Sequence, residues 1–419
     1  MAGKNLSVDK IMIDSNYLNF VFSPMVAIGL CLLMAQVLGF IFKKQQIPKI
    51  YGAVVIGLIF GQSGLQLVDL SLIKQYQEIF NAMIALVLFD VGRRLDIKWI
   101  IEQKTTAIYL ALSSLVRGLM VSGLLILLNY KTSEAFLIGA LLMATSPIIF
   151  SAIVNDNNAK GKMTFLGENS LAMNNLLAVI FTIITMIVIK GMESENSYFY
   201  LWHYLWQFIL AIAWALLGYY LYYFLGKKLN PPARSRAGIL FSIIIIIIGL
   251  CALTSALTII ALFLIGLLLR NKEKENNVFQ SQFKVGVSIG YMILFLAGAI
   301  TIDLKIVFSS FNLGYLFLIA LLIMASRIVI MRIILQLINH INNSKRNYLS
   351  LALSSIVTYS VLLVDSGSSL NNSISIQAAE LLNMIFILNI LVTPMLTQWA
   401  FKKAGETEVV IIEKEKNEQ

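Results

Sequence analysis

Long apolar runs, many close to 20 residues, follow one another along most of the 419-residue chain, with short polar or charged stretches between them. A helix of about 20 apolar residues spans the hydrocarbon core of a bilayer, so this pattern predicts an all-α polytopic membrane protein. We expect about thirteen transmembrane helices, over residues 21–42, 47–61, 76–92, 105–128, 135–154, 165–190, 198–225, 237–250, 253–269, 284–301, 312–338, 347–365 and 376–400. Residues 237–269 could instead form one long tilted helix.

Composition and charge support a membrane protein and give it an orientation. The chain is 58% hydrophobic and 13% charged, whereas a soluble domain is about a quarter charged. With thirteen spans, the loops on one side carry 23 Lys and Arg residues and those on the other carry 6. Basic loops favour the cytoplasm, which predicts a plasma (inner) membrane protein with residues 1–20 outside and a short charged tail, 401–419, inside. One helix over 237–269 would move every later basic loop to the outer side of the membrane, so two short spans are favoured.

The net charge of +10 is explained by these basic loops, and no nucleic-acid partner is expected. Residues 1–20 lack a basic segment followed by an apolar core and a small-residue cleavage site, so no signal peptide is expected. Cys31 and Cys251 lie inside apolar spans, and the two histidines, His203 and His340, are far apart in the sequence. We therefore expect no disulfide framework, no metal site and no cofactor.

An internal repeat relates the two halves of the chain. The stretch 86–100, LVLFDVGRRLDIKWI, resembles 293–308, ILFLAGAITIDLKIVF, and the charge count places the two on opposite faces. One motif on opposite faces indicates an inverted-topology repeat. Extending the register pairs 105–128 with 312–338, 135–154 with 347–365 and 165–190 with 376–400. We predict a first repeat at about 47–190 and a second at about 253–400.

Polar residues interrupt two of these spans. Thr145-Ser146-Pro147 lies in the middle of one apolar run, where the proline removes a backbone donor and clashes with the preceding turn. Asn174-Asn175 lies inside the next span, where two amides need partners or a ligand. Broken helices and polar groups near the membrane centre build the ion sites of many secondary transporters. Under the repeat, Ser354-Ser355 and Thr358 lie opposite the first break, so a second broken helix is expected without a proline.

Several motifs together resemble the cation:proton antiporter superfamily, the sodium/hydrogen exchanger and Kef-type transporter family. The resemblance covers about residues 20–400. It rests on four motifs and one arginine within a span. The motifs are the Phe89, Gly92 and Asp96 pattern, Ala-Thr-Ser-Pro at 144–147, Ala-x-Asn-Asn-Leu-Leu-Ala at 172–178 and Thr-Pro-x-Leu…Ala-Gly-Glu at 393–406, and the arginine is Arg327. It implies thirteen spans, two inverted six-helix repeats with crossed discontinuous helices, a homodimer and elevator-like alternating access. The tail after Ala404 lacks the nucleotide-binding domain that Kef-type channels often carry.

The chain departs from the family at the ion site, where Asn174-Asn175 replaces the usual Asp-Asp or Asn-Asp. In the family the second Asp binds the cation and releases protons in its place. An amide offers a carbonyl oxygen but no titratable proton near neutral pH. Thr145, Ser146, Asn174 and Asn175 are therefore candidate cation ligands, while proton coupling needs another group.

Glu168 is the only acid in the span that carries the two asparagines, and it lies two helical turns before Asn175. It could carry the proton, pair with Arg327, or only solvate the helix start. Arg327 and Arg117 lie within spans, where an arginine is costly unless it is paired or faces a cavity. Each could balance site charge or bind unwound carbonyls. Without an opposing acid they would repel cations, which would suit an anion-conducting variant.

Other acids are expected in ordinary surroundings. Asp90 is expected at an interface or paired with Arg93 or Arg94, and Asp156 in a loop beside Lys160 and Lys162. Asp365 and Glu380 flank an outer loop, where they are solvated or attract cations.

The sequence as a whole predicts a secondary active transporter that exchanges Na+ or K+ for H+ by alternating access. The alternative is a proton-uncoupled cation uniporter or a transport-inactive regulatory homologue, because the site carboxylate is replaced. The expected partners are these ions, membrane lipids and a second copy of the chain. An enzyme is not expected, since the sequence shows no metal cluster, no Ser/His/Asp set of plausible spacing and no Gly-rich phosphate loop.

Overall fold

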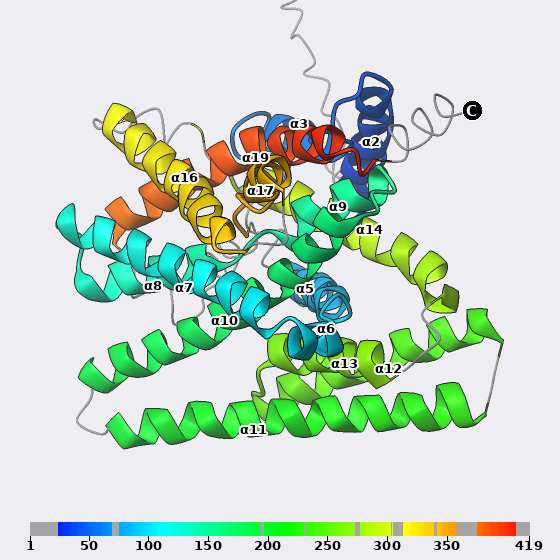
Figure 1. Ribbon diagram of the computed structural model, residues 1–419. Helices are drawn as coiled ribbons and strands as arrows, with labels where there is room; N and C mark the ends of the chain where they lie inside the picture. Colours follow the sequence, from blue (N-terminus) through cyan, green and yellow to red (C-terminus); the bar gives the residue numbers. More distant parts are fainter. Residues whose placement is uncertain are drawn as a thin grey trace, which may run out of the picture.

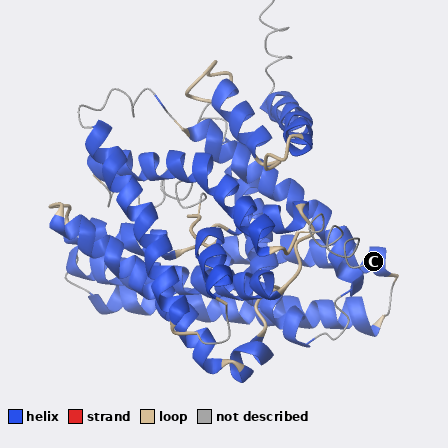
Figure 2. Ribbon diagram, turned by 45° about the horizontal axis from the view of Figure 1, so that its top comes forward, coloured by secondary structure: helices blue, strands red, loops and turns tan. Residues whose placement is uncertain are grey.

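Helices make up nearly all of the chain in the computed structural model (Figures 1 and 2). The structure describes residues 24–68, 75–193, 197–229, 232–272, 277–302, 304, 313–338, 342–357 and 375–407. Within these ranges, the β-type backbone pairing consists of one isolated antiparallel bridge, between Thr145 and Ile356. The predicted all-α class is therefore confirmed. The N-terminal segment 1–20, His340, Thr358, Asp365 and the end of the tail lie outside the described residues.

The first helices in chain order are α2 (Pro24–Lys44), α3 (Tyr51–Phe60), α5 (Gln77–Gly92), α6 (Ile97–Glu102), α7 (Lys104–Leu127), α8 (Thr132–Met143), α9 (Pro147–Asp156) and α10 (Lys162–Glu193). They are followed by α11 (Ser197–Tyr222), the π-helical turn η1 (Tyr223–Lys228), α12 (Ala233–Thr254), α13 (Thr258–Lys272), α14 (Asn277–Thr301), α16 (Leu313–Gln336), α17 (Asn343–Ala352) and α19 (Ile376–Ala404). Ser255, at φ 54°, separates α12 from α13. The prediction of two helices rather than one over 237–269 is confirmed.

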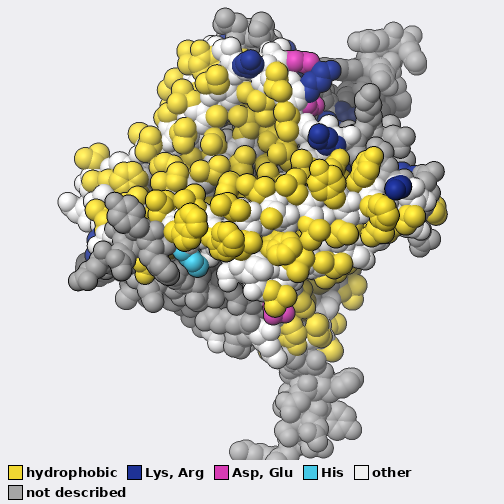
Figure 3. Space-filling model, turned by 90° about the horizontal axis from the view of Figure 1, so that it is seen from below, with side chains coloured by type: hydrophobic (Ala, Val, Ile, Leu, Met, Phe, Trp, Pro, Cys, Tyr) yellow, Lys and Arg dark blue, Asp and Glu magenta, His cyan; other side chains and the backbone are white. Residues whose placement is uncertain are grey.

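Seven of the described helices are long and apolar enough to cross a membrane. Four shorter apolar helices, α3, α8, α9 and residues 286–301 of α14, add to them. Apolar side chains cover most of the face seen in Figure 3. Such a surface suits hydrocarbon rather than water, because exposed apolar area of this extent is costly in water. The number of thirteen spans stays a prediction.

Two glycines let α5 and α13 approach each other closely. A Cβ atom at Gly92 would lie 2.1 Å from the Phe263 carbonyl oxygen, and one at Gly266 would lie 2.2 Å from the Phe89 carbonyl oxygen. Each glycine therefore admits the backbone of the other helix. Asp96, the last residue of this motif, is the N-cap of α6 and accepts a hydrogen bond from the Trp99 amide at 3.0 Å. The Phe89, Gly92 and Asp96 pattern is thus explained by packing and capping.

Candidate functional site

Two breaks in the helices cross in the middle of the molecule. The first lies between α8 and α9, where Ser146 is the N-cap of α9 and accepts from the Ile149 amide at 3.3 Å, with Pro147 in the first turn. The proline lacks an amide hydrogen, which suits a helix start. The second break follows α17, and the two are joined by the Thr145–Ile356 bridge and by a hydrogen bond from the Ser146 amide to the Ser355 carbonyl at 3.3 Å. The discontinuous helix predicted at Thr145-Ser146-Pro147 is present, and α17 ends where it meets that break; the helix expected to continue after α17 lies outside the described residues.

One asparagine on each long neighbouring helix holds the backbone of a break. On α10, Asn175 donates through Nδ2 to the carbonyls of Thr145 at 2.8 Å and Leu171 at 2.9 Å. On α19, Asn389 donates to the Ile356 carbonyl at 2.9 Å and accepts from the Ile356 amide at 2.8 Å. Both asparagines are buried, and both satisfy backbone groups that unwinding exposes. Sequence reasoning missed Asn389, although the repeat pairs its helix with α10.

Asn174 differs from Asn175, because one of its atoms has no partner. Its Nδ2 donates to the Thr145 hydroxyl at 3.1 Å and to the Ser170 hydroxyl at 3.4 Å. Its Oδ1 atom is buried and has no hydrogen-bond partner among the described residues. A buried carbonyl oxygen without a donor is costly, and such oxygens are ligands for monovalent and other hard cations. The structure brings Asn174, Asn175 and Thr145 within hydrogen-bonding distance, whereas the Ser146 hydroxyl serves as a helix cap; their role as cation ligands stays a prediction.

Two fully buried arginines, on the neighbouring helices α7 and α16, donate to backbone carbonyls of the crossing. Arg327 on α16 donates to the carbonyls of Ser354 (3.2 Å), Ser355 (3.1 Å) and Ala144 (3.1 Å), and also to that of Leu142. These four acceptors belong to both breaks.

Arg117 on α7 repeats the arrangement with fewer bonds. It donates to the Ser113 carbonyl in its own helix at 3.0 Å and to the Leu353 carbonyl at 3.4 Å, while its Nη2 has no partner among the described residues. Each arginine thus donates to a carbonyl of the other repeat. Arg117 binds that of Leu353, three residues before Ile356, and Arg327 binds that of Leu142, three residues before Thr145. Ile356 and Thr145 are the two residues of the bridge. These equivalent contacts agree with the predicted repeat. Among the described residues, the hydrogen bonds of both guanidinium groups go to backbone carbonyls.

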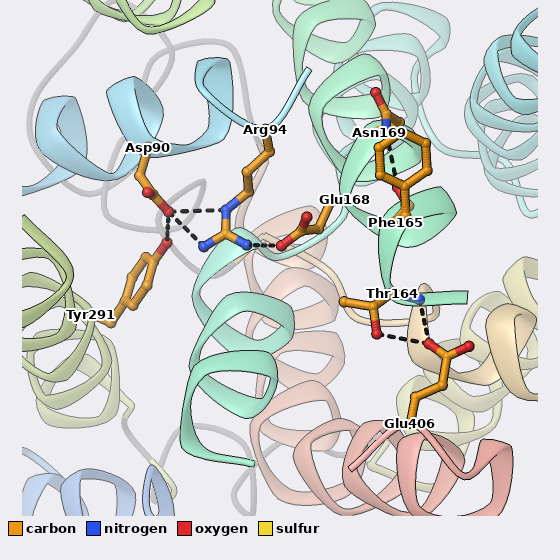
Figure 4. Close-up of polar contacts among 8 residues, drawn as sticks. All are labelled: Asp90, Arg94, Thr164, Phe165, Glu168, Asn169, Tyr291 and Glu406. Carbon is orange, nitrogen blue, oxygen red and sulfur yellow. Dashed lines mark hydrogen bonds and ion pairs between the residues drawn. The ribbon is translucent and has the colours of Figure 1, made fainter. Parts of the chain in front are cut away.

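Glu168 lies elsewhere, in an ion-pair network at the start of α10 (Figure 4). Arg94 lies between two carboxylates and donates to Glu168 at 2.5 Å and to Asp90 at 2.8 Å. The Tyr291 hydroxyl donates to Asp90 at 2.8 Å. The pairing of Asp90 with Arg94 is as expected, whereas Glu168 pairs with Arg94 and not with Arg327. The Glu168 side chain is 26% exposed, so water can reach it.

A cavity of about 330 Å³ opens beside this network. It is lined by residues of the end of α5 and the turn after it, the end of α9 and the loop that follows, the start of α10 and the end of α13, among them Asp90, Arg94, Asn155, Glu168 and Arg270. Polar groups of both signs therefore face water along the first two turns of α10, on the helix that carries the asparagines. Asp156 ends α9, and its carbonyl accepts from Lys43 at 2.9 Å, so its described neighbour is Lys43 rather than Lys160 or Lys162.

Glu406, which sequence reasoning noted only within a motif, caps the same helix. Its carboxylate accepts from the Met163 amide at 2.8 Å, the Thr164 amide at 2.7 Å and the Thr164 hydroxyl at 2.8 Å (Figure 4). Gly161 stands before the helix at φ 154° and has no side chain with which to cap it. A carboxylate at a helix N-terminus satisfies free amides and favours the helix dipole.

The same carboxylate ties three elements together. Lys345, at the start of α17, lies 3.4 Å from it, and the Glu406 carbonyl accepts from the Lys160 amide at 2.9 Å. Glu406 thereby joins the end of α19 to the first turns of α10 and α17, which lead toward the two breaks. No local sequence signal shows a cap that comes from more than 240 residues away.

These features define a class of protein: a polytopic helical membrane transporter in which the break between α8 and α9 pairs with the backbone that follows α17. The chain matches the family described as "Sodium/hydrogen exchanger, transmembrane" over residues 29–403. It belongs to that family, as the sequence motifs indicated.

Solved structures confirm the fold. The chain is similar to the sodium proton antiporter MjNhaP1 from Methanocaldococcus jannaschii at pH 8, with a TM-score of 0.66 at 17% identity, over 92% of this chain and 98% of that one. An electron-microscopy structure of the same antiporter matches with a TM-score of 0.66 at 15% identity, over 94% of this chain and 97% of the other. At this identity the likeness carries the fold and not the ion specificity.

Proposed function

We propose that the protein is a secondary active transporter that exchanges a monovalent cation, Na+ or K+, for H+ by alternating access. Family membership supports cation and proton exchange as the general activity. The crossed breaks supply unwound carbonyls near the centre of the molecule, and such groups favour cations in transporters.

The observation that carries the proposal is the buried, unpartnered Oδ1 atom of Asn174. We assign the cation to this oxygen, with the Thr145 hydroxyl as a second ligand, because Asn174 already contacts that hydroxyl. Asn175 holds the Thr145 carbonyl in place, and Ser146 fixes the start of α9. The arginines keep the breaks open by occupying their carbonyls, which is a structural role and not a ligand role.

The proton is carried outside this neutral site. Glu168 is our candidate, because it lines the cavity beside the start of α10, two turns before Asn175, and shares Arg94 with Asp90.

A second candidate function, proton-uncoupled cation uniport, is favoured by one specific observation. Amides stand at both positions where the family usually has at least one titratable acid. An amide site binds a cation without exchanging a proton for it.

Further proposals concern the setting of the protein. The basic loops favour a cytoplasmic C-terminus in a plasma membrane. The exposed apolar face of α2 offers a surface for a homodimer.

A proteoliposome experiment separates the two functions. The purified protein is reconstituted with a pH-sensitive dye inside, a proton gradient is imposed, and Na+, K+ or Li+ is added with the membrane potential clamped or free. Exchange predicts that one cation dissipates the gradient in both conditions, and that Glu168→Gln slows it while the surface variant Glu102→Gln does not. A response that vanishes under the clamp would show uniport, and the absence of a response to every cation would refute both.

A further inference from the structure

A groove of about 440 Å³ lies between the C-terminal part of α19 and the loop that follows the end of α2; these are the last and first helices described. It is lined by Gln46, Met395, Leu396, Gln398, Trp399 and Lys402. Its walls are mainly apolar, and Met395 and Trp399 are each about half exposed, at 50% and 47%. In Figure 1 these two helix ends lie near each other, and the hydrogen bonds from Gln398 to the Gln46 carbonyl (3.0 Å) and from Lys402 to the Gln46 side chain (3.1 Å) join them.

One end of the groove carries polar groups that are only partly used. The Oε1 atom of Gln398 is buried and has no hydrogen-bond partner among the described residues. The Lys402 ammonium group has three donors, and the described structure uses one of them on Gln46. A single ligand that donates a hydrogen bond to the amide oxygen and accepts one from the lysine would satisfy both groups.

The charge at this end is positive. The last turn of α2 carries Lys43 and Lys44, and the last turn of α19 carries Lys402 and Lys403. Basic residues also stabilise helix C-termini, which would explain their presence on each helix separately. It does not explain the orphaned amide oxygen, nor the apolar groove with a half-exposed tryptophan directly beside them. Tryptophan and basic residues together mark the level of the lipid headgroups.

We infer that this groove, between α2 and α19, is a binding site for an anionic glycerophospholipid. The lipid phosphate accepts from Lys402, a headgroup hydroxyl donates to the Gln398 Oε1 atom, and an acyl chain lies against Met395 and Trp399. A lipid fits better than a soluble anion, because most of the groove wall is apolar. It fits better than a second copy of the chain, because a partner helix would bury Lys402 rather than pair its charge.

The experiment measures lipid binding and not transport. Full-length protein in detergent receives phosphatidylglycerol or phosphatidylcholine at equal mole ratio, and its melting temperature and retained lipid are determined, the latter by native mass spectrometry. Phosphatidylglycerol should raise the melting temperature by several degrees, since a ligand that binds only the folded state stabilises it. Phosphatidylcholine and soluble glycerol phosphate should not.

Two neighbouring lysines provide the matched control. Lys402→Gln should reduce phosphatidylglycerol retention about fivefold, the effect of one basic side chain at a membrane surface. Lys403→Gln should change it little, because Lys403 is exposed and does not line the groove. Lys402→Arg, which keeps the charge, should retain the lipid, and a lipid-free melting temperature of Lys402→Gln equal to that of the wild type would show that its loss is not a folding defect.

Three results would overturn the inference. Equal loss in Lys402→Gln and Lys403→Gln would mean diffuse surface charge. An equal rise with glycerol phosphate would mean a soluble anion site. A rise that appears only together with a dimer would assign the groove to a second copy of the chain.

Discussion

Substitution of Arg327 tests quantitatively how much this side chain stabilises the crossing. In the variant Arg327→Met, four backbone carbonyls lose their donor: those of Leu142, Ala144, Ser354 and Ser355. All four lie at buried breaks, where water does not replace the guanidinium. A buried carbonyl left without its donor costs about 1–3 kcal/mol, so the loss of the donor to four carbonyls should cost several kcal/mol in all.

Arg117→Met is the matched control for this variant. Arg117 is equally buried, but it donates to two carbonyls and keeps one nitrogen without a partner. The loss of its bonds is offset by the release of an unpaired buried donor, so we expect a cost of about 1–2 kcal/mol. The ratio of the two effects, rather than either value, tests the reasoning.

The assay is thermal unfolding of the purified variants in one detergent, followed by intrinsic tryptophan fluorescence. We expect Arg327→Met to melt well below the wild type and Arg117→Met to lie between them. The reasoning would be refuted if both variants lost the same stability, or if Arg327→Met melted with the wild type. Either result would mean that the carbonyls of the breaks are not held by Arg327.

Three further predictions follow from single contacts. Glu406→Ala should lower the melting temperature and speed amide hydrogen exchange at the first turn of α10, because three donors lose their acceptor; unchanged exchange there would contradict the capping role. Asn175→Asp would place a carboxyl oxygen against the two carbonyls that now accept from its Nδ2. The new side chain therefore needs a proton or a cation, and transport should become more steeply pH-dependent. An identical rate–pH profile would count against this site. Gly92→Ala should unfold at a lower temperature because its Cβ would lie 2.1 Å from a backbone oxygen, whereas Gly249→Ala, with nothing within 4 Å, should be unaffected or slightly stabilised; equal effects would refute the close approach of α5 and α13.

Much of the fold could be predicted from the sequence, because a bilayer constrains it strongly. The lengths of the apolar runs predict the helices, and the charge count separates α12 from α13. The break at Thr145-Ser146-Pro147 could be placed because proline cannot continue a helix at that position. The proximity of Asn174 to Thr145 followed from the same reasoning, since a broken helix needs polar partners at its own depth.

Other contacts of the site could not be predicted, because they join residues far apart in the sequence. The arginine partner of Glu168 lies just after the end of α5, 74 positions earlier, and periodicity gives no register between α5 and α10. Asn389 was overlooked because a single asparagine in an apolar run gives no sign of its partner. The carbonyl acceptors of Arg327 also leave no trace in side-chain patterns, so a buried arginine suggested an acid that the described contacts do not provide.

The assignment of the cation to Asn174 is the central claim, and one measurement tests it most directly. Cation-driven dissipation of a proton gradient is recorded in proteoliposomes over a range of cation concentrations, for wild type, Asn174→Ala and Asn157→Ala. Asn157 lies at the end of α9 and donates to the Ile153 carbonyl, so it controls for the loss of an amide away from the crossing. The account predicts that Asn174→Ala loses transport or needs at least about tenfold more cation, the effect of one lost ligand of about 1.4 kcal/mol, while Asn157→Ala behaves as the wild type. Wild-type transport by Asn174→Ala, with an unchanged KM for the cation, would contradict it.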